Sequence, residues 1–67
     1  MKTIYSVDKT RFNTSTGKVQ FNLCVSCDTI EEAKKYFNYW RKVDPDCVIE
    51  LDQLHPYKMI DYYEPNL

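Results

Sequence analysis

An amphipathic segment between Asp28 and Asp46 constrains the fold of this chain more than any other part of the sequence. Asp28 can accept a hydrogen bond from the amide of Glu31 while the Glu31 side chain reaches back, which predicts a capping-box start. Asp44 precedes a proline, which disfavours helical geometry at Asp44 and predicts the end of the helix. At about 100° per residue, the apolar side chains share one face: Ile30, Ala33, Tyr36, Phe37, Trp40 and Val43. The sequence therefore predicts one helix on an apolar layer, with Trp40 largely buried.

Alternating apolar and polar residues predict strands on both sides of this helix. The pattern is clearest in residues 18–26, where one side is expected to meet the helix: Val19, Phe21, Leu23 and Val25. Three further strands are predicted: residues 3–7 (extendable towards Phe12), 47–51 and 57–63. Residues 57–63 could also form a short helical turn, but an edge strand is favoured. The only glycine, Gly17, lies between the first two strands, where a turn needs positive φ.

These elements predict a single small α+β domain over residues 1–67, in the order β-β-α-β-β. The sheet is expected to be antiparallel, with the helix packed on one face and the other face polar and hydrated. A chain of this length buries only about 60% of its unfolded surface, and an open sheet has two edges with unpaired backbone groups. We therefore expect a homodimer.

The composition is that of a folded cytoplasmic protein. Hydrophobic residues make up 43% of the chain and aromatic residues 15%, which argues against disorder. Apolar runs are too short to cross a bilayer, and charges come too early for a signal peptide. The three cysteines are an odd count, which argues against a closed disulfide framework and for a reducing compartment.

The cysteines are the first candidates for chemistry, because Cys24 and Cys27 form a C-x-x-C pattern. Zinc would take four ligands, and Cys24, Cys27, Cys47 and His55 supply that number. However, strand alternation points Cys24 and Cys27 to opposite faces, which argues against zinc. The acidic residues that follow Cys27 raise thiol pKa values, which argues against a redox role of the C-x-x-C. We therefore expect neither metal nor other cofactor. The sequence also has no recognisable nucleophile context and no glycine-rich phosphate loop, so we expect no enzymatic activity.

The charge distribution points to a binding surface. The net charge is −1, but residues 44–67 carry six acidic residues against Lys58 alone. Tyrosines are frequent in the same region and are enriched at protein interfaces. We expect partner binding through these residues: Glu50, Asp52, Tyr57, Asp61, Tyr62 and Tyr63. Glu50 and Asp52 share a strand face, and alternation alone explains them as the solvent side of that strand.

The function predicted from these observations is a non-catalytic protein-binding module that docks on a basic protein partner. A small inhibitor or decoy is the natural form, in the style of phage and mobile-element proteins that block host enzymes. One alternative is a nucleic-acid-binding accessory domain, with a basic hairpin carrying Lys2, Lys9, Arg11 and Lys18 beside Tyr5 and Phe12. Another is a small zinc-stabilised domain. No membrane association is expected.

Overall fold

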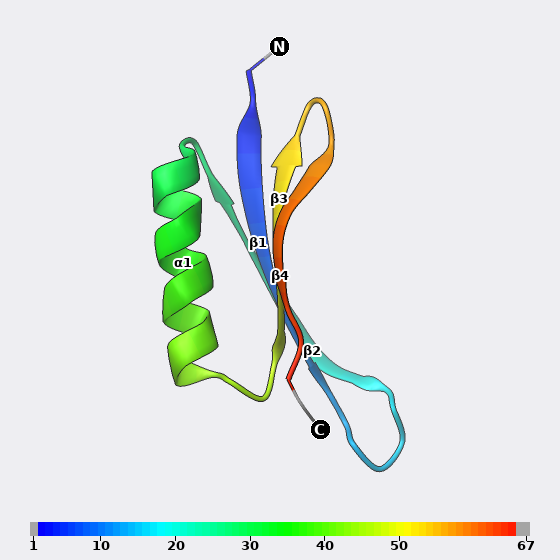
Figure 1. Ribbon diagram of the computed structural model, residues 1–67. Helices are drawn as coiled ribbons and strands as arrows, with labels where there is room; N and C mark the ends of the chain where they lie inside the picture. The colour runs from blue at the N-terminus through cyan, green and yellow to red at the C-terminus, as the bar shows by residue number, and fades with distance from the viewer. Residues whose placement is uncertain (1, 66–67) are drawn as a thin grey trace.

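The computed structural model describes residues 2–65 and shows a four-stranded antiparallel sheet with one helix on one face (Figure 1). The elements are β1 (Ile4–Phe12), β2 (Val19–Cys27), α1 (Ile30–Val43), β3 (Val48–Leu54) and β4 (Lys58–Tyr63). The strands lie in the order β2-β1-β3-β4, so the first strand of the chain is hydrogen-bonded on both sides. The predicted α+β class and the β-β-α-β-β order are confirmed.

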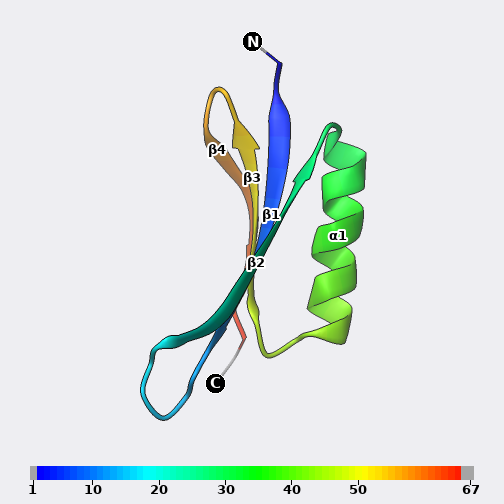
Figure 2. The same ribbon diagram turned by 180° about the vertical axis from the view of Figure 1, so that it is seen from behind.

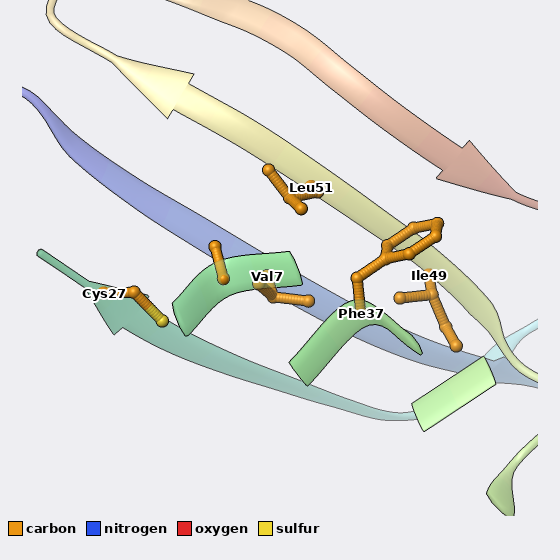
Figure 3. Close-up of a cluster of buried hydrophobic side chains, with 6 residues drawn as sticks. Val7, Cys27, Phe37, Ile49 and Leu51 are labelled. Carbon is orange, nitrogen blue, oxygen red and sulfur yellow. The ribbon is translucent and has the colours of Figure 1, made fainter. Parts of the chain in front are cut away.

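The hydrophobic core lies between α1 and the two central strands (Figure 3). Val7 on β1 pairs directly with Leu51 on β3, and Ile49 follows on the same side of β3. Phe37 comes down from the helix onto this layer and is almost fully buried. Cys27 closes the core next to the start of the helix and acts there as a small apolar residue.

The helix begins one residue later than predicted. The N-cap is Thr29, with extended backbone (φ −126°, ψ 153°), and its hydroxyl accepts a hydrogen bond from the amide of Glu32 at 3.2 Å. The predicted capping box at Asp28 is therefore wrong, and the Asp28 carboxylate instead lies 3.3 Å from the ammonium of Lys2. The end at Asp44 is confirmed, because its amide donates to the carbonyl oxygen of Trp40 at 2.8 Å.

Fewer residues of the helix are buried than its apolar face predicts. Ala33 and Phe37 are buried, whereas Trp40 is only partly buried and Tyr36 is 39% exposed. Trp40 packs against the core, which agrees with the expectation of a largely buried Trp40, but it is not fully buried. The reason is topological: α1 runs over β1 and β3, while β2 lies at the edge and diverges from the helix (Figure 2). On β2, Val25 packs against the core but Leu23 remains 51% exposed.

The β1–β2 hairpin extends beyond the end of the helix (Figures 1 and 2), and the molecule measures 42 × 21 × 16 Å. Its loop is closed locally, because the Asn13 side chain accepts hydrogen bonds from the amides of Ser15 and Thr16. Gly17 has φ +73°, which confirms the predicted turn glycine.

Candidate functional site

The open face of the sheet, opposite α1, gathers carboxylates from the two central strands. Asp8 on β1 lies directly opposite Glu50 on β3, and Asp52 follows two residues after Glu50 on the same face. Asp8, Glu50 and Asp52 each offer an oxygen atom within 4.8 Å of the others. We call these three residues the acidic cluster. Because all three lie on strands of the sheet, the backbone ladder fixes their spacing.

The closeness of the other two carboxylates changes the pKa of Glu50. A hydrogen bond that protonated Glu50 can donate to Asp52 raises the pKa of Glu50 to about 7, and burial and the charges of Asp52 and Asp8 act in the same direction. Asp52 is only 4% exposed, and its Oδ1 is buried without a hydrogen-bond partner among the described residues. The prediction that Asp52 faces solvent is therefore wrong. Its cross-strand neighbours, Ser6 and Met59, flank it on the same face.

Two further side chains near the acidic cluster have raised pKa values. Cys24 lies opposite Asp8 on β2, and a hydrogen bond to Asp8 raises the pKa of the Cys24 thiol to about 11. Tyr57, in the turn after β3, is 64% exposed. Desolvation, followed by the charges of Asp52 and Glu50, raises the pKa of its hydroxyl. Cys24 therefore stays a protonated thiol at neutral pH, and Tyr57 lies within electrostatic reach of the carboxylates.

A hollow of about 680 Å³ lies between the loop of the projecting hairpin, the start of β3 and the end of β4, and Tyr62 separates it from the acidic cluster. Phe12 on β1, Val48 on β3 and Tyr62 on β4 are among the residues that line it. Tyr62 is directly opposite Glu50, so it lies between the hollow and the acidic cluster. Phe12 is 42% exposed and Tyr62 45% exposed, which leaves apolar surface accessible beside the charges.

The structure brings together four of the six residues predicted to bind a partner. Glu50, Asp52, Tyr57 and Tyr62 form or border the acidic cluster, as described above. Asp61 pairs opposite Leu51 and Tyr63 opposite Ile49, both of which are core residues on the helix side. The Tyr63 hydroxyl donates to the carbonyl oxygen of Pro45 at 2.7 Å, so this tyrosine anchors the loop after the helix.

The acidic C-terminal region and the basic N-terminal hairpin partly neutralise each other. The Lys9 ammonium lies 2.8 Å from Asp44, and Arg11 pairs with Asp46 at the surface. Lys2 pairs with Asp28 at 3.3 Å. Since three of the four cations predicted to contact nucleic acid lie in ion pairs, the hairpin offers little free positive charge.

The four residues proposed as zinc ligands lie apart. Cys24 is exposed on the open face, whereas Cys27 and Cys47 are buried on the helix side. Cys47 precedes β3 and His55 follows it, so these two lie at opposite ends of the strand. Burial is the main cause that raises the pKa of the Cys27 and Cys47 thiols. These two cysteines are core residues in this fold.

Asp8 is the residue of this site that the sequence analysis missed. It is the one acidic residue in the first 18 positions, and it shares its strand face with the polar residues Ser6 and Thr10. That polar alternation was a usable signal for the open face. It could not show that Asp8 meets Glu50, because this contact depends on β1 and β3 being neighbours.

Comparison of the chain with protein-family models, with curated proteins and with solved structures finds no match. Within residues 2–65, α1 is neither long enough nor apolar enough to cross a membrane. The site must therefore be interpreted from its own geometry.

Proposed function

We propose that this protein is a non-catalytic binding module that docks the open face of its sheet onto a basic segment of a protein partner. The observation that carries the proposal is the acidic cluster itself. None of the ion pairs within residues 2–65 involves Asp8, Glu50 or Asp52. Uncompensated negative charge on a rigid surface favours a cationic partner and speeds its encounter.

The surroundings of the acidic cluster suggest the chemistry of that partner segment. A lysine or arginine side chain would place its cation among the carboxylates, where it would form charge-assisted hydrogen bonds. Tyr57 and Tyr62 offer aromatic faces beside that position, and such faces attract cations. The hollow beside Tyr62 has a mixed lining, and its apolar part, made by Phe12 and Val48, would take an apolar residue next to the basic one. The proposed ligand is therefore a basic residue flanked by an aliphatic or aromatic residue.

We propose an inhibitor or decoy as the form of this function, and the cytoplasm as its location. The Cys24 thiol is held protonated, so it is a poor nucleophile, which favours binding over catalysis. All three cysteines are free, as is usual in a reducing compartment.

We also propose that the protein forms a homodimer. Edge strands β2 and β4 each have one side without a neighbouring strand, and β2 exposes Val19 and Leu23 beside its edge. Sedimentation velocity over a range of concentrations tests this proposal. A mass that rises towards twice that of the chain supports it, and a monomer at the highest concentration overturns it.

Photocrosslinking tests the docking surface. A benzophenone amino acid replaces Tyr62 on the open face or, as the control, Tyr39 on the outer face of the helix, which is 60% exposed. The variants are expressed in the cells that produce the protein naturally and are irradiated there. We expect a protein adduct from position 62, absent from position 39, whose crosslinked peptide contains lysine or arginine.

Charge variants complete this test. Glu50→Gln should remove the adduct at position 62, whereas Lys35→Glu together with Lys42→Glu on the helix should leave it intact. Crosslinks only from position 39, or loss of binding only with the helix variants, would move the interface to the helix. A nucleic-acid adduct would favour the accessory-domain alternative instead.

A further inference from the structure

We propose that Asp8, Glu50 and Asp52 form a binding site for a hard divalent cation of the Ca²⁺, Mg²⁺ and Mn²⁺ class. This proposal goes beyond the binding function above and does not depend on it, because the cation would bind the isolated chain. It also departs from the sequence-based expectation that the protein binds no metal.

The spacing of the three carboxylates suits such an ion. Their oxygen atoms lie within 4.8 Å of one another. Two oxygens on opposite sides of a calcium ion, each at about 2.4 Å, are separated by about 4.8 Å. Three oxygens at this upper limit would each lie about 2.8 Å from an ion at their centre, so small side-chain adjustments, without any strand moving, would bring all three to bonding distance. Water would complete the coordination shell, as is common for these cations.

The unpartnered oxygen of Asp52 is an independent observation for the site. Asp52 is 4% exposed, and its Oδ1 accepts no hydrogen bond from any residue between positions 2 and 65. Buried carboxylate oxygens normally have a partner, since an unmet acceptor is destabilising. Here the nearest ionisable neighbours, Asp8 and Glu50, are acidic as well. A bound cation would satisfy this oxygen and neutralise the repulsion at the same time.

The ligand atoms favour hard cations over zinc or copper. All three ligands are carboxylates, which suit calcium, magnesium and manganese. The neighbouring Cys24, a soft sulfur donor, lies opposite Asp8 on β2 but is not one of the three residues whose ligand atoms lie within 4.8 Å of one another. The Ser6 hydroxyl, opposite Asp52, adds another oxygen nearby.

A second group of potential ligands lies in the loop between α1 and β3, and it differs from the acidic cluster in its charge balance. Asp44, Asp46 and Cys47 also approach within 4.8 Å of one another. However, Asp44 is paired with Lys9 and Asp46 with Arg11, so this group is already neutralised. We expect the cation at the acidic cluster and not at this second group.

Nuclear magnetic resonance of the full chain can test the proposal directly. Isotope-labelled protein is stripped with a chelator and titrated with MnCl₂, whose paramagnetism broadens nearby signals. We expect saturable broadening centred on the amides of Asp8, Glu50 and Asp52. CaCl₂ should compete with it.

Two variants and one control make the test specific. Asp52→Asn and Glu50→Gln should each weaken Mn²⁺ binding at least about tenfold, because each removes a charged ligand. Asp46→Asn, in the second acidic group, should change the affinity less than about twofold. A dispersed spectrum verifies that each variant is folded, and Glu50→Gln decides the matter if Asp52→Asn does not fold.

Three results would overturn the proposal. The first is the absence of saturable broadening up to about 10 mM MnCl₂, a concentration above the dissociation constants of weak calcium modules. The second is broadening centred on residues 44–47, and the third is unchanged Mn²⁺ affinity in a folded Glu50→Gln variant. Since no partner is present in these titrations, a negative result leaves the crosslinking test of partner docking unaffected, and the reverse is also true.

Discussion

Lys9 and Asp8 are neighbours in β1 and point to opposite faces of the sheet. Lys9 has an oppositely charged partner on its face, whereas Asp8 lies beside residues of its own charge. Lys9 points under the helix and is 8% exposed, with its ammonium 2.8 Å from Asp44 and 4.9 Å from the centre of the Trp40 ring. Asp8 points to the open face and meets Glu50 and Asp52, which carry the same sign. The helix side thus compensates its buried charge, and the open side does not. Uncompensated charge of this kind lowers stability unless a ligand neutralises it.

The largest expected effect comes from the core of the helix side. Phe37→Ala should destabilise the protein by ~3–5 kcal/mol, because it removes a buried aromatic ring and leaves a cavity. Trp40→Ala should have a smaller effect, since Trp40 is only partly buried. Urea unfolding followed by circular dichroism measures both. If Trp40→Ala proves the more damaging substitution, Trp40 rather than Phe37 is the main anchor of the helix.

The compensated charge of Lys9 should also stabilise the fold. Lys9→Ala should destabilise the protein by ~2 kcal/mol, the range of a charge-assisted hydrogen bond, since it breaks the pair with Asp44. A double-mutant cycle with Asp44→Ala isolates the pair from the packing of the Lys9 stem on Trp40. Zero coupling energy in that cycle would show that Lys9 is only a packing residue, and the contrast between the faces would weaken.

The matching substitution on the open face should have the opposite sign. In a chelator-containing buffer, Asp52→Asn should stabilise the protein by ~1 kcal/mol, because an amide can donate where the carboxylate leaves an unmet oxygen. The same urea unfolding measures the change. A clear loss of stability would mean that the Asp52 charge is already compensated in the free protein.

The smallest predicted effect is a dependence of stability on pH. The folded pKa of Glu50, about 7, lies above its ordinary value of 4.5, so the folded state binds more protons than the unfolded state between these values. Stability should therefore be greatest at the acidic end and fall as pH rises through this window. Thermal melts between about pH 5 and pH 8, again with chelator, measure this dependence. Glu50→Gln should flatten it, and an unchanged slope in that variant would assign the dependence to another group.

Local patterns in the sequence predicted the elements of this fold well. Period-2 alternation correctly placed Ile49 and Leu51 in the core and Glu50 on the opposite face. The proline after Asp44 correctly marked the end of the helix. These features depend on neighbours in the chain, so they are accessible to sequence reasoning. The start of the helix was misplaced by one residue, because Asp28 and Thr29 are both good caps and tertiary contacts decide between them.

The candidate site was harder to predict, because it depends on strand order. Glu50 and Asp52 were identified, but Asp8 joins them only because β1 lies beside β3 in one particular register. For the same reason, the sequence could not show that Asp44 and Asp46 are paired with Lys9 and Arg11. The acidic region thus looked like one continuous surface, whereas the structure divides it between the two faces.

The central position of β1 has a consequence for synthesis of the chain. β1 and β2 can pair as soon as both leave the ribosome, but the other edge of β1 stays open until β3 has been translated. A free edge of this kind invites pairing with a second nascent chain. Asp8 lies on that strand and carries a charge that has no counter-ion there. The residue that leaves the finished sheet with unbalanced charge can therefore act as a gatekeeper against aggregation while the protein is being made.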